Sequence, residues 1–265
     1  MPESVLLERT GPVATLTLNR PESLNTLDFT MMEALVAHTA ALAADASLRC
    51  VVVKGAGRHF MAGGDLHTFA EMLPLPPAER KARFVAIIGR LHAAIENLQR
   101  MPHPVVASVH GAVAGFGLSL MNACDLVVAA DTAFFTSAYR HIGLTPDGGG
   151  SYTLPRIVGV KKAMEIMLLG ERFDAQQALS LGLVNRVVAA TELDAATAAL
   201  VATLVAGPRR ATANAKRLVN ESLGNTLSRQ LDAEAESFSD CTTEDDFVEG
   251  IRAFVEKRPP RFGGP

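Results

Sequence analysis

A short run of apolar residues, "RCVVVKG" at 49–55, constrains the fold more than any other feature of this chain. Consecutive apolar side chains are typical of a strand that is covered on both faces, as in a parallel sheet. Two further apolar segments lie at 102–111 and 125–131, and helical segments at 28–45 and 81–100 are interspersed with them. Strands and helices that alternate in this way form crossover units. The sequence therefore predicts an α/β fold.

Shorter segments complete this pattern. The β-rich runs 13–18 and 133–136 are expected to be strands. The segment 71–80 is interrupted by prolines, and we expect it to be a mobile surface loop before the helix at 81–100.

The last third of the chain has a different pattern, because helical segments follow one another without strands between them. The first of them begins with a Thr or Asp cap and ends at Gly207-Pro208, a helix stop. Three more helical segments follow, and each has an apolar stripe that needs a partner in the same chain or in another subunit. We expect residues 1–190 to form the core and residues 191–265 to form a helical extension of it.

Charge and composition exclude several classes of function. The net charge is -3, tryptophan is absent, and there are only two tyrosines, so a nucleic-acid partner is not expected. The three cysteines, Cys50, Cys124 and Cys241, have no CxxC spacing, which indicates a reducing compartment. No apolar run reaches the roughly 18 residues of a membrane span, and no secretory signal is recognisable. The expectation is a soluble cytoplasmic protein with no membrane partner.

Common catalytic motifs are absent from the sequence. There is no GxxxxGK[ST] phosphate loop, no GxGxxG, no GxSxG nucleophile elbow and no HExxH. The histidines do not pair at the spacing of metal ligands, and no metal site is predicted. His59, His103, His110 and His141 each stand alone near a loop and are interpreted as solvated or locally bonded rings.

Two segments have the same pattern, and this pattern can form a catalytic site. In each of 51–66 and 105–120, an apolar strand runs into a loop of small residues that opens a helix. Backbone N–H groups at such a place are unpaired, and small residues let a ligand approach them. Two N–H groups that converge on one point form an oxyanion hole. Ordinary strand-to-helix turns also favour glycine, so the residues by themselves leave both readings open.

Several motifs in the same order resemble the crotonase, or enoyl-CoA hydratase/isomerase, superfamily. The resemblance covers about residues 13 to 190 and continues weakly to the C-terminus. It rests on "NRPESLNTL" (19–27), "FMAGGDL" (60–66), "PVVASVHGAVAGFGLSLMNACDLVVAAD" (104–131), "FFTSAYRHIGLTPDGGGSYTLPRIVG" (134–159), "AMEIMLLGERFDAQQALSLGLVNRVV" (163–188) and "FVEKRPPRF" (254–262). The resemblance implies a ββα spiral core with a helical C-terminal part that serves for trimerisation or as a lid. It also implies a homo-oligomer, as a trimer or a dimer of trimers, and an acyl-CoA thioester substrate that reacts through an enolate without a prosthetic group.

The resemblance assigns roles to individual residues. It implies that the backbone N–H groups of Gly64 and Phe116 form the oxyanion hole, and that the Phe116 ring, where most relatives have glycine, lines the acyl pocket. Asp65 is expected to cap a helix. The coenzyme A part of the substrate is expected to contact Ser23, Leu24, Ala62, Gly63, Gly64, Asp65, Leu66, Phe254 and Lys257.

The acid/base groups depart from the pattern of hydratases in this family. The two glutamates of such hydratases correspond to Ser119 and Tyr139 here, which puts hydration in doubt because adding water needs an oriented base and a proton source. Asp147 lies in "TPDGG", where dienoyl-CoA isomerases and isomerases of phenylacetate degradation carry a catalytic aspartate; chlorobenzoyl-CoA dehalogenases carry a nucleophile there. One carboxylate is sufficient to shift a double bond. Burial would raise its pKa from about 3.9 toward neutrality.

Several alternatives stay open. The favoured function is an enoyl-CoA isomerase that uses Asp147. The others are a hydratase with another acid, a hydrolase or dehalogenase with Asp147 as nucleophile, and a non-catalytic acyl-CoA-binding protein. Asp147 is also consistent with a simple Pro-Asp-Gly turn. Tyr139 can orient a substrate, supply a proton or only pack, whereas Arg140 and His141 are weaker candidates. The acyl chain and the number of subunits are not determined.

Overall fold

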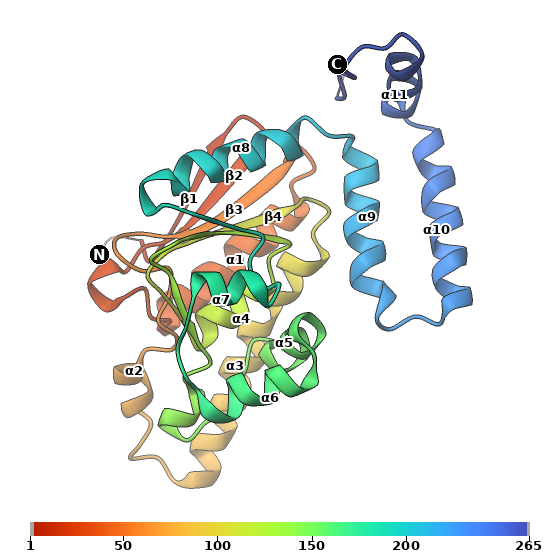
Figure 1. Cartoon of the computed structure of the whole chain (residues 1–265). Helices are drawn as coiled ribbons and strands as arrows, with labels where there is room; N and C mark the ends of the chain where they lie inside the picture. Colours follow the sequence, from red (N-terminus) through yellow and green to blue (C-terminus); the bar gives the residue numbers. More distant parts are fainter. Residues whose placement is uncertain (1–2, 264–265) are drawn as a thin grey trace.

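The computed structural model describes residues 3–263 and has a mixed α/β body from which the last helices project (Figure 1). The strands are β1 (Val5–Thr10), β2 (Val13–Leu18), β3 (Cys50–Gly55), β4 (Val105–Val109), β5 (Ala112–Ala114), β6 (Leu126–Ala130), β7 (Phe134–Thr136), β8 (Phe173–Asp174) and β9 (Arg186–Val188). The helices are α1 (Phe29–Ala44), α2 (Leu66–Ala70), α3 (Pro77–Arg100), α4 (Phe116–Asn122), α5 (Gly150–Val158), α6 (Val160–Leu169), α7 (Ala175–Ser180), α8 (Leu193–Val205), α9 (Arg209–Ser222), α10 (Leu227–Thr242) and α11 (Asp245–Val255). Short 3₁₀ helices lie at Pro21–Ser23, Tyr139–Ile142 and Ala190–Glu192.

The strands form two sheets. The six-stranded sheet has the order β1-β2-β3-β4-β6-β9, and only the β1–β2 pair is antiparallel. The three-stranded sheet has the order β5-β7-β8. The chain passes from β4 to β5 through Gly111, whose φ of +57° is in the left-handed region that favours glycine. The large parallel part confirms the predicted α/β class.

The surroundings of strand β3 explain why its apolar run is continuous. Val51 and Val53 belong to the core cluster that contains Met31 and Leu35 of α1. Their neighbours Cys50 and Val52 belong to a second cluster, with Leu193 and Leu200 of α8. Successive side chains of a strand point to opposite faces. Helices therefore cover this strand on both faces, as its sequence predicts.

Most predicted elements are present, with shifted ends. The backbone N–H of Met31 donates a 2.8 Å hydrogen bond to the Asp28 side chain, so Asp28 is the N-cap of α1. Helix α3 begins at Pro77, four residues before the predicted start, because proline is favoured in the first turn of a helix. Helix α8 begins after Glu192 without a side-chain cap, so the predicted Thr or Asp cap is wrong. The sequence analysis missed β1 and several very short strands.

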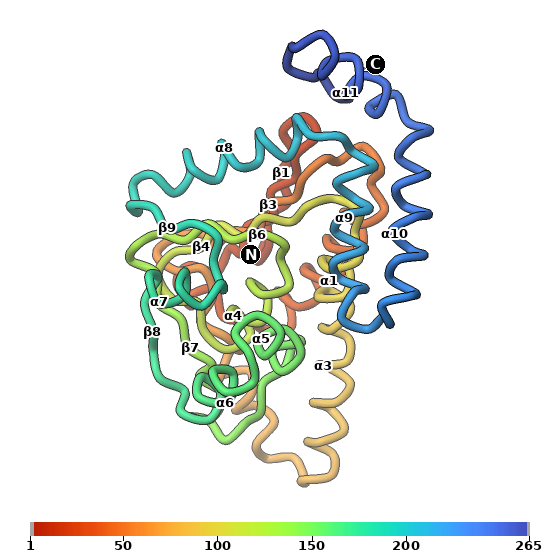
Figure 2. Tube along the Cα trace, turned by 45° about the vertical axis from the view of Figure 1, so that its right-hand side comes forward, coloured from red at the N-terminus to blue at the C-terminus, as the bar shows by residue number. Residues whose placement is uncertain are grey.

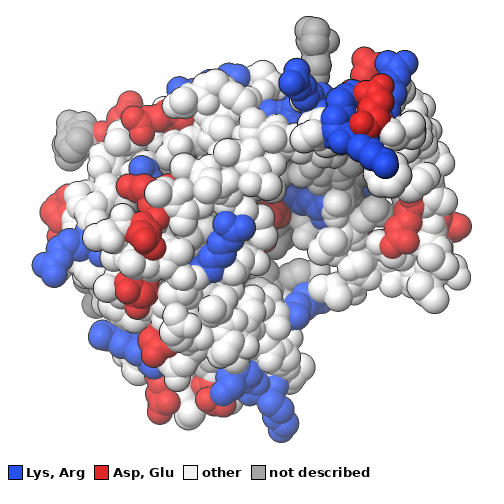
Figure 3. All heavy atoms as spheres, turned by 45° about the horizontal axis from the view of Figure 1, so that its top comes forward, with Lys and Arg blue, Asp and Glu red and all other residues white. Residues whose placement is uncertain are grey.

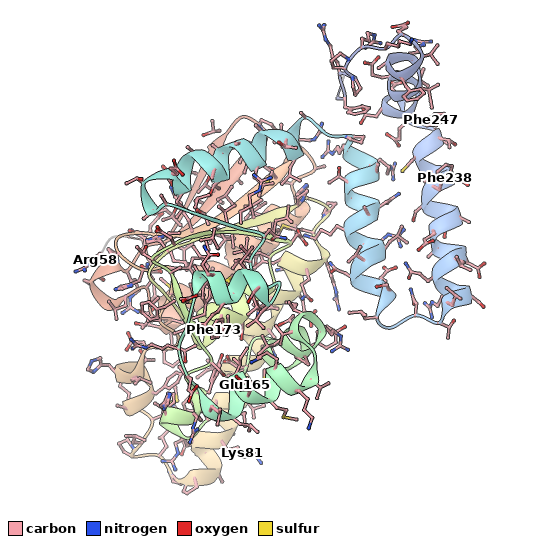
Figure 4. All side chains as sticks on the ribbon, viewed as in Figure 1. Arg58, Lys81, Glu165, Phe173, Phe238 and Phe247 are labelled. Atoms are coloured by element: carbon pink, nitrogen blue, oxygen red, sulfur yellow. The ribbon has the colours of Figure 1, made fainter. Side chains whose placement is uncertain are left out.

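The C-terminal helices divide into two groups. Helix α8 covers one face of the large sheet, whereas α9 and α10 run side by side and α11 lies beyond them (Figures 1 and 2). Lys216 holds α9 to the body, because its Nζ lies 2.8 Å from Asp125 Oδ2 and donates hydrogen bonds to two backbone carbonyls. Several large apolar side chains of these helices are exposed: Leu223, Leu227, Leu231, Phe238, Phe254 and Val255. Two of the phenylalanines, Phe238 and Phe247, are labelled on α10 and α11 in Figure 4.

The surface has no dominant charge on the face shown in Figure 3, where basic and acidic side chains are interspersed. Within the described residues, no single helix has the length and apolar composition needed to cross a membrane. Residues 190–205 and helix α9 meet that requirement only as a pair bent by 107°.

Candidate active site

A pocket of about 560 Å³ lies between α1, α2 and α3 on one side and the loops before α4 and α5 on the other. Its lining is mostly apolar. It includes Gly64, Phe116, Tyr139 and Asp147, four residues that the sequence analysis placed in the catalytic site. A larger pocket of about 740 Å³ opens beside α8 and contains none of these four.

Two backbone segments meet at one wall of this pocket. Met61 and Val113 form a parallel bridge, and the chain runs on from them in the same direction to Gly64 and Phe116. A methyl group added to Gly115 would lie 3.4 Å from Cα of Gly63, so the two glycines are in close backbone contact. Parallel segments that stay in register bring equivalent residues side by side. The N–H groups of Gly64 and Phe116, one residue further along, therefore lie at neighbouring places.

Both of these N–H groups remain available. Phe116 is the first residue of α4, where the N–H has no partner inside the helix. Within residues 3–263, neither this N–H nor that of Gly64 donates a hydrogen bond to another residue. Two free donors at one wall of a mostly apolar pocket are what an oxyanion hole requires.

Asp147 lies in this pocket within a small polar group. The Tyr139 hydroxyl donates a 2.5 Å hydrogen bond to Asp147 Oδ1, and the Ser119 hydroxyl donates one of 2.8 Å to the Asp147 backbone carbonyl. Asp147 Oδ2 has no hydrogen-bond partner among the described residues. The two positions that correspond to hydratase glutamates thus both bind Asp147, one through its carboxylate and one through its backbone.

The glycines after Asp147 form a tight turn. Gly150 N donates to Asp147 O at 3.0 Å, and Gly148 and Gly149 have φ values of +57° and +78°. Two consecutive residues with positive φ are typical of a type I′ turn, which glycine adopts without strain. A methyl group on Gly148 would lie 2.7 Å from the Phe116 ring. The turn that the sequence left open as an alternative role for Asp147 is present over residues 147–150, and it packs the Asp147 loop against Phe116.

Burial changes the acidity of both groups in this hydrogen bond. Burial raises the pKa of Asp147, while the hydrogen bond from Tyr139 and the nearby His92 act to lower it, with a net increase. The direction agrees with the prediction from sequence. Burial also raises the pKa of Tyr139 strongly, and the negative charge of Asp147 adds to the effect. Tyr139 therefore stays protonated and donates, while the carboxylate of Asp147 is a stronger base than an exposed aspartate.

His92 is a pocket residue that the sequence analysis missed. It lies on α3 and lines the pocket, and its Nε2 is buried without a hydrogen-bond partner in the described part of the chain. Ile88 and Ile95, at i−4 and i+3, place it on an apolar face of the helix. In the sequence, only this spacing could have indicated that His92 faces the pocket. The same spacing is also typical of a histidine packed in the core.

A second acid in the pocket lining, Asp28, already has partners within the chain. Its side chain caps α1 and lies 3.3 Å from Arg20 Nε. Arg20 also pairs at 3.0 Å with Asp65, which accepts hydrogen bonds from backbone N–H groups at the start of α2. Asp65 is thus the helix cap that was expected. Of the two acids in the lining, Asp28 and Asp147, only Asp147 has an oxygen available to a substrate.

The residues predicted to contact coenzyme A fall into two groups. Ala62 N donates a 3.1 Å hydrogen bond to Leu24 O, which brings the loop after the Pro21–Ser23 turn to the segment 62–66. Leu24 and Leu66 are exposed near the pocket. Phe254 is 83% exposed on α11, which lies apart from α2 in Figure 1, and Lys257 follows that helix. The structure brings Ser23, Leu24 and 62–66 together but does not place Phe254 or Lys257 beside them.

The weaker candidates have local partners. Arg140 donates hydrogen bonds to the carbonyls of Leu168 and Leu169, and a His141 ring nitrogen lies 3.1 Å from Gly170 O. Both side chains therefore tie the Tyr139–Ile142 turn to the end of α6, although His141 also lines the pocket. Among the described residues, no group of three His, Cys, Asp or Glu side chains is placed to hold a metal ion.

Comparison with known proteins identifies the family. The model of the family "Enoyl-CoA hydratase/isomerase" matches residues 8–265. A probable enoyl-CoA hydratase of Rhodobacter capsulatus is 38% identical over 254 residues, which cover 95% of each chain. The 1,2-epoxyphenylacetyl-CoA isomerase of Escherichia coli is 35% identical over 264 residues, which cover 100% of each chain.

Solved structures agree with the sequence comparison. The crystal structure of an enoyl-CoA hydratase from Polaromonas sp. JS666 matches with a TM-score of 0.90 at 37% identity, covering 98% of this chain and 99% of that one. The match confirms the predicted crotonase-type fold. Enzymes of the matched family use CoA thioester substrates and need no prosthetic group. This chain is therefore an enzyme of the enoyl-CoA hydratase/isomerase family.

Proposed function

We propose that this enzyme shifts a carbon–carbon double bond in an enoyl-CoA, with Asp147 as the group that moves the proton. The observation that carries the proposal is the environment of Asp147: a half-buried carboxylate that lines the apolar pocket, with one oxygen held by Tyr139 and the other free. Neighbouring positions 119 and 139 hold a serine and a tyrosine, so this group has no second carboxylate to activate water.

In the proposed reaction, Asp147 takes a proton from C2 of a 3-enoyl thioester. The electrons of the broken C–H bond move into a dienolate whose oxygen accepts hydrogen bonds from the N–H groups of Gly64 and Phe116. The protonated Asp147 then returns a proton to C4, and the double bond ends between C2 and C3. Removal of one donor from such a pair typically lowers kcat by about 10²–10³. The free Asp147 oxygen acts as base, and Tyr139 holds the carboxylate in position.

Tyr139 is proposed to have a positioning role, because its raised pKa keeps it from acting as an acid of moderate strength. The Phe116 ring is 2% exposed and packs on Gly148. It would narrow the pocket on the side of Asp147 and hold the acyl chain close to the carboxylate.

Coenzyme A is proposed to lie along Ser23, Leu24 and the segment 62–66. The exposed side chains of Leu24 and Leu66 give this path an apolar surface. Phe254 and Lys257 could reach the same coenzyme A only from another copy of the chain or after a movement of α11. We therefore also propose that residues 191–265 take part in a homo-oligomer, in which the exposed apolar faces of α9, α10 and α11 are covered.

A second candidate is hydration, and His92 is the observation that favours it. His92 lines the same pocket as Asp147, and an imidazole with an unpartnered ring nitrogen has the chemistry of a general base. The names of relatives are consistent with both reactions, since one is called an isomerase and another a probable hydratase.

The test is a product analysis in D₂O with 3-enoyl-CoA and 2-enoyl-CoA as substrates. Isomerisation predicts conversion between the two, with deuterium in the acyl chain and no added water. The Asp147→Asn variant should lose about 10²–10⁴ in kcat/KM, the usual contribution of general acid–base catalysis. The His92→Gln variant should keep most of the isomerase rate.

Other outcomes identify the alternatives. Formation of a hydroxyacyl-CoA that depends on His92 would indicate hydration. Binding of acyl-CoA without turnover would indicate a binding protein. Full isomerase activity in Asp147→Asn would overturn the proposal.

A further inference from the structure

The larger pocket of about 740 Å³ is separate from the acyl pocket. It opens where β2, β3 and β4 end, on the face of the large sheet that α8 covers. In the described residues, the linings of the two pockets have no member in common. Neither the family match nor the proposed reaction gives this pocket a role.

Three polar side chains lie next to one another on its floor. Thr17, Lys54 and Ser108 are partners in register across β2, β3 and β4. Neighbouring strands lie about 4.8 Å apart, and partners in register share a face of the sheet. The Lys54 side chain is therefore flanked by a hydroxyl group on each side. On the same face of β3, the preceding residues Cys50 and Val52 are apolar and packed against α8.

These side chains have hydrogen-bonding capacity that the described chain does not use. Lys54 is only partly exposed and has neither an ion pair nor a hydrogen bond among residues 3–263. Thr17 is 6% exposed, and its Oγ1 is buried without a partner. Ser108 Oγ accepts a 3.0 Å hydrogen bond from Thr197 of α8, which leaves its own O–H free to donate. Buried polar groups are nearly always paired, and a desolvated charge without a partner is costly.

The loops at the mouth of the pocket add further donors. Ala112 N donates a 3.0 Å hydrogen bond to His59 Nδ1, so the neutral ring carries its proton on Nε2. Burial lowers the pKa of His59, and the neighbouring Arg58 adds to this effect, so the neutral ring is favoured. Arg58 lies at the outer edge of the body in Figure 4. The floor and the mouth therefore present donors and positive charge.

The acidic side chains at this pocket form no direct ion pair with these basic groups. Glu8 and Asp194 belong to the lining and are exposed, and within the described chain neither pairs with Lys54 or Arg58. The unpaired donors on the floor match a ligand group that only accepts hydrogen bonds. Carboxylate and phosphate groups are the common ligands of that kind.

We propose that this pocket binds a small organic anion, whose carboxylate or phosphate group sits on Lys54 Nζ between the hydroxyl groups of Thr17 and Ser108. The size of the pocket is in the range of about 300–1,000 Å³ of small-molecule sites, so it has room for a metabolite and not only for a bare ion. The apolar side chains of Leu6 and Phe134 in the lining would contact the carbon skeleton.

The test is calorimetric titration of the full-length protein at low salt with two probes, inorganic phosphate and succinate. They distinguish a phosphate ligand from a carboxylate ligand. We expect at least one to bind with a Kd of about 1 mM or tighter. Lys54→Gln should weaken this binding about tenfold or more, and Thr17→Val about threefold, since a charge-assisted hydrogen bond exceeds a neutral one.

Two controls locate the binding. Lys161→Gln removes an exposed lysine on α6 that lines neither pocket, and it should leave the affinity unchanged. Asp147→Asn changes a carboxylate that lies only in the acyl pocket, and it should also leave the affinity unchanged.

The proposal is overturned if neither probe binds, as would happen if a second copy of the chain filled the pocket. It is also overturned if both variants bind as well as the wild type, or if Asp147→Asn weakens the binding as much as Lys54→Gln does. Thr17→Val changes no charge and little volume, so it decides the matter even if Lys54→Gln fails to fold.

Discussion

At the scale of residues, the proposed reaction depends on one hydrogen bond between Tyr139 and Asp147. That bond favours the ionised carboxylate, whereas burial disfavours it. Removal of the phenol in Tyr139→Phe should raise the pKa of Asp147 further. Because the proposed base is the ionised form, the acidic limb of the kcat/KM profile should move to higher pH. Isomerase rates measured across the pH range in the wild type and the variant test this shift.

A merely structural tyrosine gives a different result. Loss of packing alone would lower the rate equally at every pH. The profile would then keep its shape, and the assigned role of Tyr139 would be incorrect.

Asp147 should also lower the stability of the fold at neutral pH. Its folded pKa is raised, so folding favours the protonated form. The stability that goes with protonation is present at low pH and is lost as the pH rises through the folded pKa. Asp147→Asn keeps an oxygen that can accept from Tyr139 but carries no charge. Urea denaturation should find this variant at least as stable as the wild type at pH 7, with the advantage shrinking toward about pH 4.

The opposite result would be informative. If Asp147→Asn were less stable than the wild type at pH 7, the hydrogen bond to the carboxylate would outweigh its burial. The variant therefore separates activity from stability at one residue.

At the scale of elements, the loop before α5 depends on glycine for two distinct reasons. Gly143 and Gly148 both have positive φ, but only Gly148 lies against other groups, namely the Phe116 ring and Ser119. Gly143→Ala should cost about 1–2 kcal/mol, from backbone strain alone. Gly148→Ala should cost about 1–3 kcal/mol more, because the added methyl overpacks the site. It should also lower activity, because Asp147 precedes it.

Urea denaturation of both variants, with kcat/KM of each, checks this pair. Equal losses of stability would mean that backbone strain alone explains the glycines. The packing of Gly148 against Phe116 and Ser119 would then have no energetic consequence.

At the scale of the whole molecule, the C-terminal helices leave apolar surface uncovered. Leu231 and Phe238 of α10 are 53% and 74% exposed, and a patch of this kind marks an interaction surface. If it is covered in a homo-oligomer, replacing both residues by serine should shift the protein toward monomers. Light scattering coupled to size-exclusion chromatography measures the mass of the particle.

Leu73→Ser is the matched control, since Leu73 is 66% exposed on the loop before α3. It should leave the mass unchanged. A monomeric wild-type protein would refute the proposed oligomer directly.

The sequence by itself determined most of the elements and the family. The apolar run around Val52 required a strand with two covered faces, Asp28 marked the start of a helix, and the ordered motifs indicated the family that the comparisons then showed. These features are local, because periodicity and capping report on burial and backbone within one element.

Only the tertiary structure decided which residues meet. It brought Tyr139 to Asp147, placed His92 in the same pocket and aligned Thr17, Lys54 and Ser108 on another face of the sheet. The physical reason is that such contacts depend on strand register and on how helices pack across the sheet. Those are properties of pairs of elements far apart in the chain, and the pattern within either element does not contain them.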